Sequence, residues 1–111
     1  MAIPHAKAGE IVDLRPLAAA LTKTLTQTII KTDDLEVIRI VLPAGKELPP
    51  HQVPGEITVQ CLEGTVAFRV GEVNRELTAG SMLYLEGGSN HSLRASENSS
   101  ILVTILLRHK L

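Results

Sequence analysis

Residues 57–70 read ITVQCLEGTVAFRV. Two short runs rich in Val, Ile, Thr and Phe flank the pair Glu63-Gly64, and every second residue of the first run is apolar. Such alternation is typical of a strand with one buried face, and glycine provides the backbone freedom that a tight turn needs. The stretch therefore predicts two strands joined by a sharp corner.

The same pattern continues on both sides of this stretch. Gly, Pro, Asn and Asp interrupt apolar runs at close intervals, which is typical of an all-β sandwich or barrel. The run 43–54 holds four of the six prolines, so we expect a loop or an interrupted sheet edge there. The predicted strands cover residues 24–31, 35–42, 57–62, 66–70, 73–77, 82–86, 91–95 and 100–107.

The first residues differ from this strand-rich part. Leu14, Leu17, Ala18 and Leu21 recur at helical spacing, and Asp13 stands where an N-cap would lie. This predicts one short helix over residues 13–22. We expect an N-terminal segment over residues 1–23 and a barrel over 24–111, together forming a single domain.

Composition excludes several classes of function. The chain has 111 residues and a net charge of −1, without a charged run that would favour nucleic acid. Its longest apolar stretch, 101–107, is too short to span a bilayer, and residues 1–10 hold no apolar signal region. Cys61 is the single cysteine, so no internal disulfide forms. These observations predict a cytoplasmic protein without membrane or nucleic-acid partners.

The last predicted strand, 100–107, is apolar on both faces. A small barrel buries only one face of a strand, so the other face must meet a second layer. We expect a second copy of the chain to provide it, in a homodimer. The alternative is that the N-terminal helix covers this face.

Two spaced motifs resemble those of the cupin superfamily, small proteins that fold as a double-stranded β-helix, or jelly-roll barrel. The first cupin motif is Gly, five residues, His-x-His, three or four residues, Glu, six residues, Gly, and Gly45, His51 and Gly64 occupy its places. In the second motif, Gly80 and His91 match the spacing, with Glu86 where Pro is usual. The resemblance to small RmlC-like cupins implies a cupin barrel.

The resemblance also implies where a metal would lie. Metal-binding cupins use three histidines and one glutamate, and these places fall on His51, Val53, Ile57 and His91. Only two of the four can ligate, so we expect either no cofactor or a weakly bound divalent transition metal at His51 and His91. Glu56 precedes the expected carboxylate by one residue and would face inward only if the strand starts with a bulge.

A ligand pocket is the alternative use of the same interior. Val53, Ile57, Val59 and Cys61 are expected to share the inward face, with the two histidines as the polar pair. His51 and His91 would then bind a polar group of a ligand or a weak metal. The alternative is that water or backbone satisfies them and that they have no function, but we favour binding because a buried polar ring without a partner is costly.

These observations support three hypotheses. The first is a cupin that binds a small organic molecule and has a degenerate metal site. The second is a metal-dependent enzyme of the dioxygenase or isomerase type with a two-histidine site. The third is a closed barrel that acts only through its dimer surface. A cavity beside the histidines would argue against the third, and metal content separates the first two.

Overall fold

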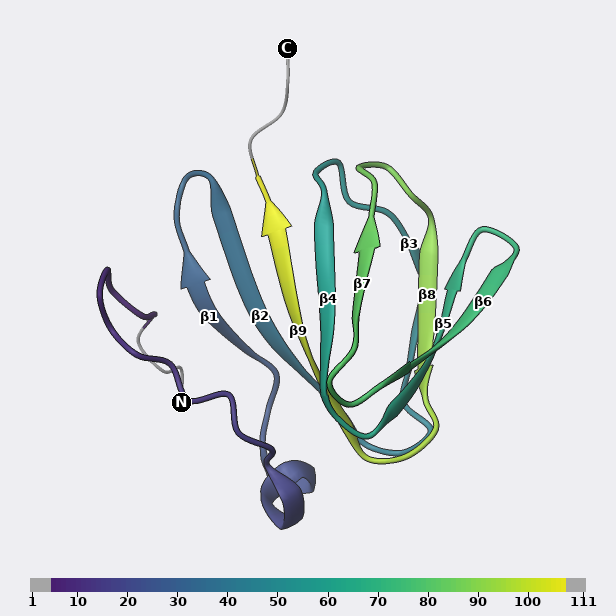
Figure 1. The fold of residues 1–111 in the computed structure, drawn as a ribbon, viewed down its shortest axis with the longest axis horizontal. Coiled ribbons are helices and arrows are strands. Elements are labelled where there is room, and N and C mark those ends of the chain that lie inside the picture. The colour runs from purple at the N-terminus through teal and green to yellow at the C-terminus, as the bar shows by residue number, and fades with distance from the viewer. Residues whose placement is uncertain (1–4, 108–111) are drawn as a thin grey trace.

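The computed structural model describes residues 5–107, which form nine strands in two antiparallel sheets (Figure 1). The five-stranded sheet has the order β1-β2-β9-β4-β7, and the four-stranded sheet has the order β3-β8-β5-β6. The all-β prediction is confirmed. In the described part of the chain, no helix has the length and apolar character needed to cross a membrane.

The predicted strands all form with bounds that differ by no more than three residues, the largest difference being β1, which begins at Gln27 and not at residue 24, and one additional strand forms. The five-stranded sheet contains β1 (Gln27–Lys31), β2 (Leu35–Leu42), β9 (Ser99–Leu106), β4 (Ile57–Glu63) and β7 (Met82–Leu85). The four-stranded sheet contains β3 (Glu47–His51), β8 (His91–Ala95), β5 (Thr65–Val70) and β6 (Val73–Thr78).

The corner between β4 and β5 carries the chain from one sheet to the other. Gly64 has a φ of 82°, and a Cβ atom there would collide with Ser99 and with the carbonyl of Asn98. Both constraints require glycine. Before this corner, β4 alternates as predicted, with Ile57, Val59 and Cys61 buried against the opposite sheet.

The additional strand, β3, lies at the edge of the four-stranded sheet. It pairs with β8 at Glu47, Leu48 and His51, and the register is irregular between the last two residues. Pro49 and Pro50 occupy this gap because proline has no N–H to donate to the ladder. The proline-rich run 43–54 is therefore an interrupted edge strand over Glu47–His51 with loop residues on both sides.

The main core lies between the two sheets. Fully buried side chains from both sheets meet there, with Phe68 on one sheet and Ile101 on the other among the largest. Val66, Leu42 and Cys61 fill the end near the β4–β5 corner. Burial of such side chains contributes roughly 1.5–3 kcal/mol each.

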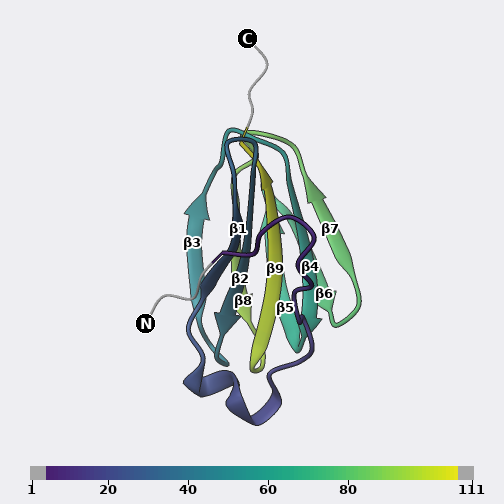
Figure 2. The ribbon, with the colours of Figure 1, turned by 90° about the vertical axis from the view of Figure 1, so that its left-hand side faces the viewer.

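Residues 5–17, which we call the N-terminal strap, cross the outer face of the five-stranded sheet (Figure 2). Val12 and Leu14 of the strap pack on a second cluster centred on Ile29, Val37 and Leu102. Leu102 is only 7% exposed as a result. The covering layer over this part of β9 is thus the strap, which is neither the second copy nor the helix that the sequence suggested.

The predicted N-terminal helix is a 3-10 helix, η1, which covers Ala18–Lys23 and not residues 13–22. Asp13 does not cap it, because its carboxylate accepts hydrogen bonds from Arg15. Arg15 precedes a proline, which disfavours helical backbone at that position. Ala18, the first residue of η1, has a φ of 49°, so the chain turns sharply where the helix begins.

Candidate functional site

A cavity of about 150 Å³ lies between the two sheets, lined by residues from both. Eleven of its lining side chains are hydrocarbon, and the remaining two are the histidines. The lining residues are Ile38, Ile40, Leu48, His51, Val53, Ile57, Val59, Phe68, His91, Leu93, Ile101, Val103 and Ile105. An apolar concave wall with a few convergent polar groups is the usual composition of a ligand pocket.

The two histidines come from adjacent strands of the four-stranded sheet. His51 at the end of β3 pairs directly with His91 at the start of β8. Their ring centroids lie 4.2 Å apart in an edge arrangement, and the His91 ring stacks on Phe68 with centroids 5.8 Å apart. His91 is 6% exposed, whereas His51 is exposed and marks the solvent side of the cavity. The structure thus brings both motif histidines to one wall.

Backbone carbonyls determine the tautomer of each imidazole. The Nδ1 atom of His51 lies 2.9 Å from the carbonyl oxygen of Pro49, and that of His91 lies 3.0 Å from the carbonyl oxygen of Ser89. A carbonyl oxygen can only accept, so each Nδ1 must carry the proton. Each neutral ring then has its lone pair on Nε2, and no described residue bonds to either Nε2 atom.

The surroundings favour the neutral form of His91. Burial lowers the pKa of His91 below its ordinary value, although the hydrogen bond to Ser89 acts in the opposite direction. The adjacent His51 lowers the pKa further, because two protonated rings would repel each other. The buried member of the pair is therefore a hydrogen-bond acceptor at neutral pH.

The loop before β8 is held against the segment that follows β3. The Gly88 N–H donates to the carbonyl of Val53 at 2.8 Å. A Cβ atom on Gly87 would collide with the carbonyl of Pro54, so only glycine permits this close approach. These contacts hold together the two segments that carry Val53 and His91, both of which line the cavity.

Three of the four apolar residues proposed from the sequence line the cavity, namely Val53, Ile57 and Val59. Cys61 faces the interior, but it lies in the core beyond the cavity lining and donates to the carbonyl of Glu63. Burial raises the pKa of the Cys61 thiol, so it is protonated and unreactive at neutral pH. The sequence reasoning missed the walls contributed by β2 and β9, whose apolar alternation was the available signal.

Glu56 does not contribute to the cavity. Its side chain is exposed, and its Oε2 atom accepts a hydrogen bond of 2.6 Å from the hydroxyl of Tyr84 on β7. β4 begins regularly at Ile57, without the bulge that could have turned Glu56 inward. The carboxylate thus belongs to the outer face of the five-stranded sheet.

The donor set does not fit the metal site that the family resemblance implies. Two imidazole nitrogens converge, while Val53 and Ile57 present hydrocarbon where the third and fourth ligands would stand. Among residues 5–107, no group of three or more His, Cys, Asp or Glu side chains is placed to hold a metal ion. Two imidazoles would leave most of a first-row ion's coordination shell to water.

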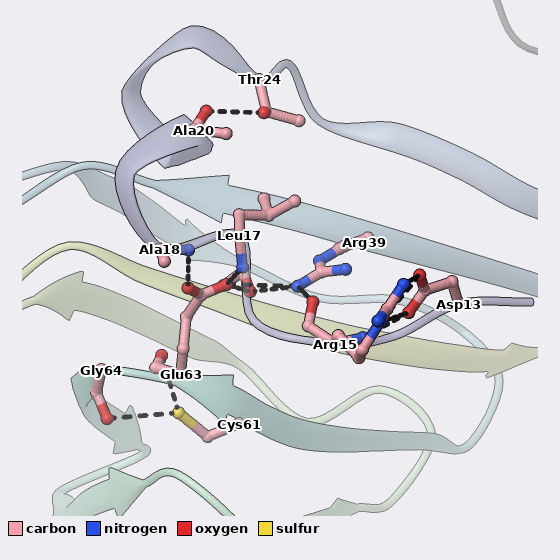
Figure 3. Close-up of polar contacts among 11 residues, drawn as sticks. Asp13, Arg15, Leu17, Ala18, Ala20, Thr24, Arg39, Cys61, Glu63 and Gly64 are labelled. Carbon is pink, nitrogen blue, oxygen red and sulfur yellow. Dashed lines mark hydrogen bonds and ion pairs between the residues drawn. The ribbon is translucent and has the colours of Figure 1, made fainter.

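A second polar cluster, which we call the clasp, holds the N-terminal strap to the sheet (Figure 3). Arg39 of β2 and Glu63 of β4 form an ion pair of 3.1 Å, with side chains only 8% and 12% exposed. Arg39 Nη2 also donates to the carbonyl of Arg15, and Ser100 donates to Glu63 at 2.5 Å. The sequence reasoning missed the clasp, although an arginine within the apolar run 35–42 was a signal for it.

Glu63 also binds the chain where the strap ends. Its two carboxylate oxygens accept the N–H groups of Leu17 and Ala18, each at 3.0 Å. Burial acts to raise the pKa of Glu63, but these hydrogen bonds, with those from the rest of the clasp, outweigh it. The pKa of Glu63 therefore lies below its ordinary value, and the carboxylate is charged at neutral pH.

Comparison with solved structures supports the fold. The conserved protein SPY1581 of unknown function from Streptococcus pyogenes is 20% identical, with 99% of this chain and 97% of that chain covered at a TM-score of 0.76. A cupin superfamily protein from Desulfitobacterium hafniense DCB-2 is 14% identical, with 93% and 100% covered and the same TM-score. An RmlC-like cupin from Shewanella frigidimarina is 19% identical, with 77% of each chain covered at 0.71.

Family assignment rests on the sequence as well as on the fold. No curated protein matches the chain. The family model for the cupin domain matches residues 38–106, which include both motif histidines and eight of the nine strands in whole or in part. The predicted double-stranded β-helix is confirmed, and the chain belongs to the cupin family.

Proposed function

We propose that this cupin binds a small organic molecule in the cavity between its sheets. The observation that carries the proposal is the pair of imidazoles, His51 and His91, whose Nε2 lone pairs are free in an otherwise hydrocarbon wall. Each ring is held by the bond from its Nδ1–H to a backbone carbonyl, so both Nε2 acceptors keep an orientation that the donor group of a small molecule can complete.

The cavity volume argues against a closed barrel that acts only through its surface. A volume of about 150 Å³ is several times that of one water molecule and equals that of apolar cavities that accept a benzene ring. The exposed His51 gives a small molecule a way in from solvent.

Binding is tested by NMR of the cavity methyl groups. Addition of toluene should shift the methyl resonances of Ile57, Val59 and Val103, which line the cavity. The methyl groups of Ile11, which is 98% exposed on the strap, serve as the control and should not move. Unchanged cavity resonances at saturating toluene would contradict the proposal.

The alternative is a metal-dependent enzyme with a two-histidine site. One observation favours it, because an Nδ1–H bonded to a carbonyl is also how metal-ligating histidines are oriented. Protein purified without chelator should contain well under one equivalent of any transition metal, as measured by mass spectrometry. A full equivalent that survives dialysis would favour the enzyme instead.

We further propose that the protein is a homodimer. The strap leaves part of the outer sheet face uncovered, where Met82, Tyr84 and Leu106 are 62%, 55% and 46% exposed. β4 lies between β7 and β9 in this sheet, so the three side chains belong to one continuous face. The apolar groups of this face lie next to uncharged Thr58 and Gln60, and the Glu56 carboxylate at its border is bonded to the Tyr84 hydroxyl, so the face suits a second copy of itself.

Light scattering tests the dimer. We expect a mass near twice the chain mass of 12.0 kDa at micromolar concentration, and a shift toward 12.0 kDa in Met82→Glu. The matched control is Val73→Glu, at a 49% exposed apolar residue on β6 of the other sheet, which should stay dimeric. A parent protein that remains at 12.0 kDa would contradict the dimer.

A reducing cytoplasm remains the proposed compartment. The single cysteine, Cys61, is a buried free thiol and serves the core without forming a disulfide. We propose no nucleic-acid partner, because the net charge is −1 and no basic run occurs in the sequence.

A further inference from the structure

We infer that the occupant of the cavity is an uncharged molecule the size of one aromatic ring that carries a hydroxyl group, as phenol does, and that this hydroxyl donates to Nε2 of His51 or His91. The inference rests on the proposed function and specifies its ligand class. Three properties of the cavity carry it, namely the direction of its hydrogen bonds, its charge and its size.

The direction of hydrogen bonding follows from the two backbone carbonyls. Pro49 and Ser89 each take the Nδ1 proton of one imidazole, so both rings present only an acceptor to the cavity. No other lining residue has a polar side chain. A ligand that only accepts hydrogen bonds, such as an ether or a ketone, would meet no side-chain donor here. The ligand must therefore bring the proton.

The charge of the ligand follows from the lining residues. None of the thirteen is Lys, Arg, Asp or Glu, so an anion would be neutralised only by protonation of a histidine, which burial opposes at His91. A carboxylate would face two nitrogen lone pairs, and an ammonium group would lose its hydration without gaining a counter-charge. Burial of an unpaired ion costs far more than burial of a hydroxyl that keeps one hydrogen bond. The cavity thus selects a neutral donor.

The size and shape favour a ring. A hydrocarbon-lined volume of about 150 Å³ has room for one benzene-sized molecule. Phe68 lies under His91 with nearly parallel planes, 16° apart, so an aromatic face already stands beside the acceptor. Branched residues such as Ile57 and Val103 form the remaining walls and would contact the edges of a ring.

The experiment compares four probes of similar size by NMR titration of the whole protein, namely phenol, toluene, benzoate and benzylamine at neutral pH. Phenol and toluene have nearly the same shape and differ in the O–H donor. We expect phenol to shift the imidazole Nε2 resonances, whereas toluene shifts only cavity methyl resonances. Benzoate and benzylammonium should bind more weakly than phenol.

A variant isolates the hydrogen bond. In the double substitution His51→Leu and His91→Leu, phenol should lose affinity relative to toluene by about 2–12-fold, the range for one neutral hydrogen bond. If that variant does not fold, the affinity for phenol relative to toluene is measured in His51→Leu, which changes only the exposed histidine. The Nε2 resonances of the unaltered protein give a readout that needs no variant.

The outcomes separate the inference from the proposed function. If toluene binds and phenol gains nothing from the histidines, or if an ion binds more tightly than phenol, the inference is overturned while cavity binding stands. If no probe moves any cavity resonance, the proposed function falls and the inference with it. Phenol binding that shifts Nε2 and loses its advantage in the variant supports both.

Discussion

The clasp and the cavity both place polar side chains among apolar ones, but they differ in how completely those groups are bonded. In the clasp, the Glu63 carboxylate accepts hydrogen bonds from two backbone N–H groups, Ser100 and Arg39. In the cavity, His51 and His91 each use one ring nitrogen and leave the other free. The contrast concerns the Glu63 carboxylate, because Arg39 Nε of the clasp is itself the only buried side-chain polar atom of residues 5–107 that lacks a partner.

The difference distinguishes a structural polar group from a receptive one. The hydrogen bonds of the clasp link the strap to two strands. They therefore contribute to the stability of the fold and leave no free acceptor oxygen on Glu63 for a ligand. The bonds of the cavity hold the imidazoles in place without satisfying them, which is the arrangement that a ligand can complete.

The largest effect is expected at Glu63. Glu63→Gln removes the charge that compensates buried Arg39, and loss of one partner of such a pair costs about 3–5 kcal/mol. Urea unfolding at pH 7 measures the difference. The control is Glu47→Gln, whose pair with Arg94 is 65% exposed on both sides, and which should change the free energy of unfolding by less than about 1 kcal/mol. Equal effects at both positions would remove the distinction between clasp and surface.

The second effect concerns the cavity wall. Changing Val53→His together with Ile57→Glu supplies the two ligands that are missing from the cupin set, so metal occupancy should rise. Without metal, the added buried polar groups should lower the free energy of unfolding by about 1–3 kcal/mol each, and added Mn²⁺ or Ni²⁺ should restore it. Metal analysis and thermal melts with and without the ion provide the test. A variant that melts at the same temperature in both would show that these side chains do not converge.

The third effect is the acid dependence of the clasp. Since the folded pKa of Glu63 lies below the ordinary 4.5, the unfolded chain takes up the proton first as the pH falls. The stabilisation is complete above about pH 4.5 and is lost as the pH drops through the lowered folded pKa. The difference in unfolding free energy between the parent and Glu63→Gln should therefore shrink from pH 7 to pH 3. A difference that stays constant would assign the stabilisation to groups other than this carboxylate.

The smallest effect is expected at the histidines. His51→Leu removes one hydrogen bond to a backbone carbonyl and also an unsatisfied acceptor, so the free energy of unfolding should change by no more than about 1 kcal/mol. Urea unfolding beside the Glu63 variant compares the two regions directly. A loss as large as that of Glu63→Gln would make the histidine pair a structural element.

Much of the barrel could be predicted from the sequence, because alternation and turn residues act locally. Ile57, Val59 and Cys61 lie on the inner face of β4 as predicted, and both motif histidines line the cavity, although His51 is exposed and only His91 is buried. The additional strand β3 was only half predicted, since proline removes the donors by which a strand is usually recognised.

The strap and the clasp could not be predicted, because both depend on contacts between distant residues. The Leu17 N–H is bonded by a carboxylate 46 residues away, and this contact overrides the helical spacing of residues 13–22. Similarly, periodicity identifies an apolar face of β9 but not what covers it. The free Nε2 atoms also needed coordinates, since carbonyls outside the motif pattern determine the tautomers.

The prolines of β3 have a consequence for aggregation. An exposed sheet edge with a row of free N–H groups can recruit a strand from another molecule and seed fibres. β3 is the edge strand of the four-stranded sheet, and through Leu48 and His51 it also forms the solvent side of an apolar cavity. Neither Pro49 nor Pro50 has a backbone N–H group, so this edge resists the addition of a strand from another molecule. The cavity can therefore stay accessible to small molecules without its edge becoming a template for aggregation.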